Sequence, residues 1–368
     1  MNLDLRDTAA QAPAASRPTI ADCDIHPCLA NARDIMPYLS ARWRAHMDQF
    51  GLLPRHGYQS GPAYPKGQPD AARRDAWPPG GRPGSDLGFM QRQHLDANNI
   101  ALGVLNVIAP AAAAAQNLDF SAAMARALND WQVAEWTSKD RRLKGSIVVP
   151  YEDPPAAAAE IAHWAGHSDF VQVLLLSRTA EPLGQRRYWP LYQAAQDAGL
   201  PIGVHAFGYG GYPVTGAGWP SFYMEEMVGH AQCCQAQLTS LVIEGVFERF
   251  PRLRLVLIEA GFAWLPPLAW RLDKHWARLC AETPHLSRAP SEYIRDHVWM
   301  TTQPREEPER RRHLRDVIGW IGANRLLFAT DYPHWDFDDP DASLPVQLDE
   351  EVRRGLFLDN ARALYGVP

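Results

Sequence analysis

The feature that most constrains the fold is an alternation of eight short apolar runs with eight stretches of helical pattern along the 368 residues. This alternation is typical of parallel strands joined by crossover helices, and eight repeats predict a closed (β/α)8 TIM barrel. Strands are expected at residues 19–26, 101–108, 143–149, 170–176, 201–205, 253–258, 297–301 and 325–330. Helices are expected at residues 86–98, 119–139, 155–165, 188–198, 223–248, 262–282, 308–318 and 348–364. An open doubly wound sheet is the second choice, but the chain has neither a G-x-G-x-x-G after the first strand nor a P-loop.

Barrels of this length often form one domain, so we expect a single barrel over residues 18–368 after a flexible tail at 1–17. Two segments interrupt the alternation. Residues 50–86, after the first strand and helix, are rich in Gly, Pro and Arg, and residues 207–219 combine glycines with aromatic residues. Long irregular insertions in compact domains are often functional. We expect both segments to be active-site loops, the second offering Tyr209 and Trp219 to a substrate. The alternative is a disordered segment for the first and a flexible surface loop for the second.

The composition narrows the partners to small molecules. A net charge of −6 and a pI near 6.1, without a basic stripe, give no reason to expect nucleic acid or an anionic membrane surface. The five cysteines form neither a disulfide framework nor a C-x-x-C pair, so we expect reduced thiols that fill space. The first fifteen residues lack the apolar core of a signal peptide, and no long uncharged apolar run follows. A cytoplasmic protein is expected.

Three of the predicted strands end in acidic residues or histidine. Asp24 and His26 are two positions apart, so they share one face of the first strand, while His205 ends the fifth and Asp331 the eighth. In a barrel these ends meet at the mouth, where active sites lie, and a buried carboxylate there needs a cation or a hydrogen-bond network. Two imidazoles and two carboxylates suit a divalent ion, with zinc as first choice and manganese as second. The alternative is four unrelated polar groups, each satisfied by hydrogen bonds.

Several motifs, spread from about residue 19 to the end of the chain, carry a family resemblance. They are DIH at 24–26, PIGVH at 201–205, GVFERFP at 245–251, EAGFAWLP at 259–266, TDYPH at 330–334 and NARALY at 360–365. Together they resemble the amidohydrolase superfamily, in the branch that holds aminocarboxymuconate-semialdehyde and resorcylate-type decarboxylases and metal-dependent hydrolases. The resemblance implies a barrel with one divalent metal, held here by Asp24, His26, His205 and Asp331. It also implies a homodimer.

Two positions depart from the family pattern. Many members have His-x-His or Glu-x-His on the first strand, where this chain has Asp24 before His26, so the metal is expected closer to that strand or differently coordinated. On strand six the decarboxylases usually carry a histidine, and this chain has Glu259. A buried Glu259 is a candidate general base toward a metal-bound water. The alternatives are a metal ligand, a partner of a substrate hydroxyl, or an ion pair with an arginine such as Arg271.

Three further residues are candidates for the site. His230, in an apolar helical stretch, is a candidate acid or base, and a packed, hydrogen-bonded histidine is its alternative. Arg178, after the fourth strand, is a candidate clamp for a substrate carboxylate, with a surface arginine as the alternative. His334 follows Asp331 by three residues and is assigned to substrate binding or to bracing the loop.

Hydrolysis is the leading functional hypothesis. A metal-activated water, deprotonated by Asp331 or Glu259, would attack an amide, ester, lactone or carbonyl-flanked carbon–carbon bond. The first alternative is non-oxidative decarboxylation of an aromatic or unsaturated acid, and the missing strand-six histidine shifts the preference to hydrolysis. The second alternative is a non-catalytic, ligand-binding barrel, which the intact set of predicted ligands disfavours.

Overall fold

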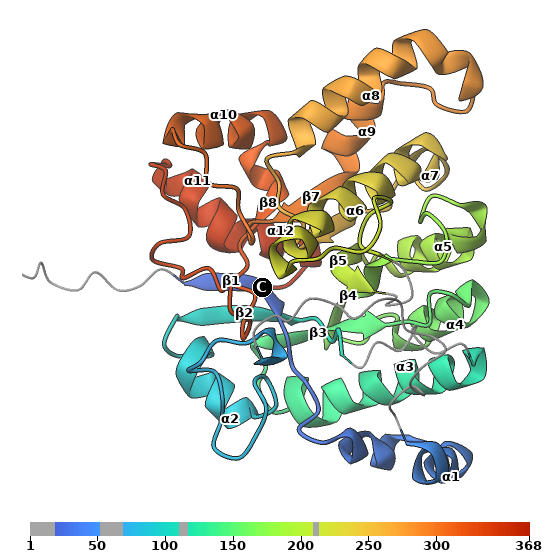
Figure 1. Ribbon diagram of the computed structural model, residues 1–368, viewed down its shortest axis with the longest axis vertical. Helices are drawn as coiled ribbons and strands as arrows, with labels where there is room; N and C mark the ends of the chain where they lie inside the picture. The colour runs from blue at the N-terminus through green and yellow to red at the C-terminus, as the bar shows by residue number, and fades with distance from the viewer. Residues whose placement is uncertain (1–18, 52–68, 110–116, 209–212) are drawn as a thin grey trace, which may run out of the picture.

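The computed structural model describes residues 19–51, 69–109, 117–208 and 213–368, and it confirms the predicted TIM barrel. Eight parallel strands lie side by side in chain order, and the helices surround them (Figure 1). The strands are β1 Ile20–Ile25, β2 Ile100–Leu105, β3 Leu143–Val148, β4 Phe170–Arg178, β5 Ile202–Gly208, β6 Leu255–Ile258, β7 Val298–Thr301 and β8 Leu326–Leu327. Each overlaps the range expected from its apolar run, because strands covered on the outer face by helices read as nearly continuous apolar segments.

Backbone hydrogen bonds close the barrel between β8 and β1. The Cys23 N–H donates to Phe328 O at 2.9 Å, and the His26 N–H donates to Tyr332 O at 2.8 Å. Both acceptors lie in the chain that runs on from the two-residue β8, so the closure continues past the last formal strand. A closed sheet leaves no edge strand exposed and gives every strand end a fixed neighbour.

Side-chain hydrogen bonds of the buried Asp22 strengthen the same seam, the contact between β1 and the chain after β8. It accepts hydrogen bonds from the Thr330 N–H at 2.9 Å, from Thr330 Oγ1 at 2.5 Å and from His94 Nε2 at 2.7 Å. Asp22 stands two residues before Asp24, and Thr330 stands directly before Asp331. The seam therefore fixes two strand ends that carry predicted functional side chains.

Local signals mark some of the ends of the surrounding helices. They are α1 Ala41–Phe50, α2 Leu87–Met90, α3 Leu118–Gln132, α4 Pro154–Trp164, α5 Trp189–Ala198, α6 Tyr223–Ile243, α7 Val246–Arg249, α8 Leu265–Leu279, α9 Pro290–His297, α10 Arg311–Ile321, α11 Glu350–Arg354 and α12 Asn360–Tyr365. The side chain of Asp153 caps α4, with Pro154 in its first turn, and the left-handed Gly199 ends α5. The helix expected at 223–248 is divided at Gly245, whose φ of 77° and close contact with His285 exclude a Cβ.

Two helices escaped the sequence-based prediction. One is α1, in which a charged or polar residue separates most of the apolar ones. The other is α9, which passes from His297 directly into β7 without a glycine or proline between them. Among the described residues, no helix is long and apolar enough to cross a membrane.

The described part of the predicted insertion, residues 69–86, lies against the chain that follows β8. The Trp335 N–H donates to Ala71 O at 2.8 Å, and the Arg73 N–H donates to Pro333 O at 3.0 Å. The insertion therefore borders the segment that carries Asp331. The role of this insertion as an active-site loop stays a prediction. The predicted flexible tail at 1–17 falls outside the described residues.

Candidate metal centre and active site

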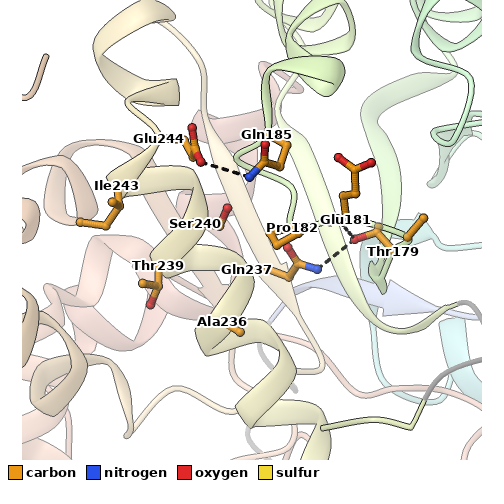
Figure 2. Close-up of a pocket in the computed structure, with 11 residues that line it drawn as sticks. Thr179, Glu181, Pro182, Gln185, Ala236, Gln237, Thr239, Ser240, Ile243 and Glu244 are labelled. Carbon is orange, nitrogen blue, oxygen red and sulfur yellow. Dashed lines mark hydrogen bonds between the residues drawn. The ribbon is translucent and has the colours of Figure 1, made fainter. Parts of the chain in front are cut away.

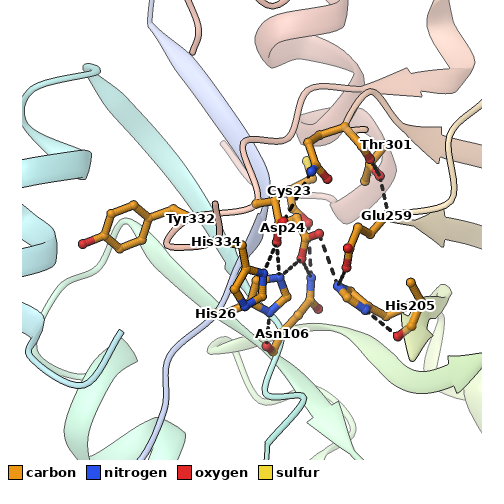
Figure 3. Close-up of polar contacts among 12 residues, drawn as sticks. Cys23, Asp24, His26, Asn106, His205, Glu259, Thr301, Tyr332 and His334 are labelled. Atoms are coloured by element: carbon orange, nitrogen blue, oxygen red, sulfur yellow. Dashed lines mark hydrogen bonds and ion pairs between the residues drawn. The ribbon is translucent and has the colours of Figure 1, made fainter. Parts of the chain in front are cut away.

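Four side chains from three strands converge at the barrel mouth (Figure 3). Asp24 comes from β1, His26 directly follows that strand, His205 comes from β5, and Glu259 directly follows β6. One ligand atom from each lies within 4.8 Å of the others, and all four side chains are buried. His205 Nε2 is 3.3 Å from both Asp24 Oδ2 and Glu259 Oε2, and His26 Nε2 is 3.1 Å from Asp24 Oδ1. The cluster brings together three of the four predicted metal ligands and adds Glu259.

Backbone carbonyls set the tautomers of both histidines. His26 Nδ1 lies 2.9 Å from Asn106 O, and His205 Nδ1 lies 2.8 Å from Ala206 O. A carbonyl oxygen only accepts, so each Nδ1 carries the proton and donates it. When these rings are neutral, the lone pair is on Nε2 of each, aimed into the cluster, as in histidines that bind metals through Nε2.

The donor atoms of the cluster fit a divalent cation. Asp24 Oδ2, His26 Nε2, His205 Nε2 and Glu259 Oε2 are all buried, and none has a hydrogen-bond partner among the described residues. Buried polar atoms are nearly always paired, so four such atoms facing one another indicate a common partner. Oxygen and imidazole nitrogen donors in this number suit manganese, iron or zinc.

A layer of polar side chains beneath the cluster holds Asp24 in place. Asn106, which follows β2, donates from Nδ2 to Asp24 Oδ1 at 2.8 Å. Its Oδ1 accepts from Ser146 Oγ at 2.7 Å and from Gln172 Nε2 at 3.0 Å, so β3 and β4 contribute to the same network. The sequence-based search missed these residues. The feature that could have revealed them is a polar residue at an inward position of an otherwise apolar strand.

Asp331 lies at the edge of the cluster and has partners of its own. Its Oδ1 is 2.9 Å from His26 Nε2 and 2.6 Å from His334 Nδ1, and its Oδ2 accepts from Gln303 Nε2 at 3.3 Å. The His334 ring also stacks on that of His26, with centroids 4.5 Å apart. The structure thus brings His334 to the site, and it leaves Asp331 close enough either to complete the metal shell or to act beside it.

Carboxylates outnumber cationic side chains at this site, and the pKa values of the carboxyl groups are shifted as a result. Burial, followed by the charges of Asp331 and Asp336, raises the pKa of Glu259 well above its usual value. Burial and the charge of Asp331 raise the pKa of Asp336 to about 8. Burial also acts to raise the pKa of Asp331, but His334 and His26 outweigh it and lower that pKa. Asp336 was not a candidate from sequence, because only the fold places it beside Asp331.

The backbone is strained at three strand ends around the mouth. Phe207, Glu259 and Asp331 adopt φ values of 76°, 51° and 62°. Left-handed conformations are uncommon for residues other than glycine, asparagine and aspartate, and where they persist they cluster at functional sites. All three residues stand at or just after strand ends around the candidate metal centre.

Four further residues were predicted to belong to the site, and the structure describes three of them. His230, on α6, is buried and reaches the site through Phe207, whose ring centroid is 4.4 Å from its own. Arg178 is the last residue of β4, and its charge acts on His230. Trp219 is half-buried in the segment before α6, and Tyr209 falls outside the described residues. The roles assigned to these four residues stay predictions.

A surface cavity of about 580 Å³ lies apart from the donors (Figure 2). Its walls come from residues 179–185, after β4, and from residues 236–244 on α6. Gln237 Nε2 donates to Thr179 Oγ1 at 3.0 Å, and Gln185 Nε2 donates to Glu244 Oε1 at 3.1 Å across it. None of the lining residues belongs to the cluster of Figure 3, so this cavity takes no part in the candidate site.

Comparison with known proteins adds a family and a set of relatives. A family model described as "Amidohydrolase" matches residues 21–367. A gamma-resorcylate decarboxylase from Polaromonas sp. is 27% identical over 290 residues, which cover 74% of this chain and 85% of that protein. A second gamma-resorcylate decarboxylase, from Rhizobium radiobacter, is 28% identical over 299 residues, which cover 76% of this chain and 87% of that protein.

A solved structure shares the fold. The 5-carboxyvanillate decarboxylase from Sphingomonas paucimobilis superposes with a TM-score of 0.68 at 21% identity, covering 95% of this chain and 99% of that one. A dihydroxybenzoic acid decarboxylase from Polaromonas sp., solved with bound manganese and 2-nitroresorcinol, superposes with a TM-score of 0.64 at 20% identity. The superposition covers 95% of this chain and 97% of the chain of the dihydroxybenzoic acid decarboxylase.

These comparisons correct the preference for hydrolysis. The named relatives are decarboxylases, which break a carbon–carbon bond, and the hydrolase assignment is therefore wrong. The preference rested on Glu259 standing where the decarboxylases usually have a histidine. The structure shows the carboxylate among the metal-binding donors, 3.3 Å from His205 Nε2, so its presence does not indicate a hydrolytic base.

Proposed function

The chain belongs to the amidohydrolase family, and on that premise we propose that it is a metal-dependent, non-oxidative decarboxylase of a hydroxylated aromatic acid. The observation that carries the proposal is the similarity to gamma-resorcylate decarboxylases over 74% of this chain and 85% of the relative. The cluster of Asp24, His26, His205 and Glu259 supports it, because a full set of metal donors is retained at the mouth of the barrel. The same cluster disfavours a non-catalytic barrel.

We propose manganese as the metal. The solved dihydroxybenzoic acid decarboxylase contains manganese, and a donor set of carboxylates and imidazoles suits this ion. Zinc, the first choice from sequence, has no such support. Asp24, His26, His205 and Glu259 would hold the ion, with Asp331 at its edge. A bound divalent ion would supply positive charge to the carboxylate and neighbouring oxygen of the substrate.

The reaction replaces a carboxylate by a proton. The bond between the ring carbon and the carboxyl carbon breaks, carbon dioxide leaves, and the ring carbon takes up a proton. We assign Asp331 to relaying that proton, because it is buried at the mouth, accepts a hydrogen bond from His334 at 2.6 Å, and has a lowered pKa that lets it give the proton up readily. Gln303, at 3.3 Å from Asp331 Oδ2, orients the carboxyl group.

Release of carbon dioxide tests the proposal. Protein loaded with Mn²⁺ is incubated with a panel of hydroxybenzoates, and carbon dioxide and the phenolic product are quantified. We expect at least one member to give both in equal amounts, and chelation of the metal to stop the release. Failure of the whole panel with a fully metal-loaded protein would overturn the assignment.

The homodimer implied by the resemblance stays a proposal. Helix α8 is a candidate interface, because Trp270 on it is 57% exposed. Light scattering on the purified protein decides between monomer and dimer, and Trp270→Glu is expected to shift a dimer toward monomer.

A further inference from the structure

His230 is a buried histidine whose ring nitrogens have no hydrogen-bond partner in the part of the chain that the structure describes. Its exposed fraction is 3%, and neither Nδ1 nor Nε2 has a hydrogen-bond partner among the described residues. A buried polar group without a partner costs about 1–3 kcal/mol, so such groups are rare and call for an explanation. The packed, hydrogen-bonded histidine considered from sequence is therefore not what the structure shows, and a bound ligand is the natural partner.

The surroundings of His230 connect it to the metal-binding cluster. The ring of Phe207 contacts that of His230, with centroids 4.4 Å apart, and stacks with that of His205 at 6.2 Å. Phe207 is two positions after His205 near the end of β5, and the stacking of the two rings shows that their side chains lie on the same side. Phe207 also holds a left-handed backbone conformation. One aromatic ring thus joins the cluster to His230.

Helix α6 is packed closely at this point. A Cβ on Gly229, the residue before His230, would lie 2.5 Å from Val214 Cγ1. The missing side chain lets the segment before α6 pack directly on the helix. The imidazole is buried and held against Phe207, and in such an environment a hydrogen bond to a ligand contributes most to selectivity.

The imidazole is neutral at physiological pH. Burial and the neighbouring charge of Arg178 lower the pKa of His230 to about 3. A neutral imidazole offers one N–H donor and one acceptor nitrogen. A hydroxyl group matches both, because it donates and accepts, whereas a carboxylate only accepts. This protonation state also argues against His230 as the acid that protonates the ring carbon.

We propose that His230 is a specificity residue that hydrogen-bonds to a hydroxyl substituent of the substrate ring, with Phe207 as the ring platform beside it. The inference rests on the proposed function and names the feature of the substrate that the site selects, namely a phenolic hydroxyl distinct from the oxygens at the metal.

Binding measurements test this assignment without relying on turnover. Benzoate and four dihydroxybenzoates (2,3-, 2,4-, 2,5- and 2,6-) are mixed with the Mn²⁺-loaded full-length protein. The dissociation constant is read from tryptophan fluorescence within milliseconds of mixing. His230→Phe keeps a flat ring and removes both nitrogens, and His230→Gln restores a donor and an acceptor. His313→Phe, at an exposed histidine, is the matched control.

We expect His230→Phe to weaken the best dihydroxybenzoate by about 10- to 100-fold and benzoate by less than about 3-fold, with partial recovery in His230→Gln. Equal losses for benzoate and the dihydroxybenzoate would show a packing role and overturn the inference. So would unchanged binding, or a wild type that does not prefer hydroxylated rings. If no carbon dioxide forms but the selective loss is observed, decarboxylation is refuted while the hydroxyl subsite stands.

Discussion

Replacing Glu259 with glutamine should have two effects of opposite sign: a more stable metal-free protein and weaker metal binding. Glu259 is 3% exposed and shares the barrel mouth with the carboxyl groups of Asp24, Asp331 and Asp336. Burial and these charges raise its pKa well above the usual value, so the carboxyl group of the folded, metal-free protein keeps its proton to a higher pH than that of the unfolded chain. Glutamine keeps the shape and needs no proton.

The size of the first effect follows from linkage. With an unfolded pKa of about 4.3 and about 1.36 kcal/mol per unit, taking up one proton at pH 7 costs at most (7 − 4.3) × 1.36, or about 3.7 kcal/mol. Glu259→Gln avoids this cost, so the metal-free variant should gain up to that amount at pH 7. At pH 5 the same product falls to about 1.0 kcal/mol. The gain should therefore shrink as the pH is lowered.

The second effect is the loss of one metal donor. A metal present at 100 times its dissociation constant stabilises the folded state by about 2.7 kcal/mol, and a 100-fold weaker site leaves about 0.4 kcal/mol. Urea unfolding of chelated and Mn²⁺-loaded protein at pH 5 and pH 7 measures both effects. Glu309→Gln, at an exposed glutamate, is the control and should change neither. A destabilised metal-free variant at pH 7, or unchanged metal affinity, would refute the reasoning.

Three further predictions concern neighbouring residues. Asp331→Asn should reduce carbon dioxide release by about 100- to 10,000-fold with an unchanged far-UV spectrum, and residual wild-type activity would refute the proton role. The pKa of Asp336, raised to about 8 from about 3.9 when unfolded, means that metal-free protein binds more protons when folded. Its stability should therefore fall as the pH rises from 4 through 8, and Asp336→Asn should flatten that fall in urea titrations. Asn106→Ala, which removes the hydrogen bond to Asp24, should weaken Mn²⁺ binding by about 10- to 100-fold by calorimetry, and an unchanged affinity would contradict its supporting role.

The barrel could be predicted from the sequence because its strands are apolar on both faces and its helices amphipathic. The run at 170–176 became β4 and the run at 201–205 became β5, each extended by a few residues toward the mouth. Helix α9 could not be seen in this way, because its eight residues carry no break before β7. Its existence depends on packing against α8, a contact between separate helices that periodicity does not encode.

Part of the site could also be predicted. Asp24, His26 and His205 stand at strand ends, and the barrel topology alone brings such positions together. The hydrogen bond from Asn106 to Asp24 could not be foreseen. Asn106 lies 82 residues from Asp24 in the sequence, and only the pairing of neighbouring strands brings the two side chains together. The role of Glu259 was open for the same reason: whether a strand-end carboxylate faces a metal or a water depends on a backbone turn, here with a φ of 51°.

The most direct test is decarboxylation in heavy water. Mn²⁺-loaded protein is incubated in D₂O with the hydroxybenzoate that binds best, and the products are analysed by mass spectrometry and NMR. We expect one carbon dioxide for each phenol, with a single deuterium at the carbon that carried the carboxylate. Recovery of unchanged acid from every hydroxybenzoate, with the metal site shown to be filled, would contradict the assignment of this chain as a decarboxylase.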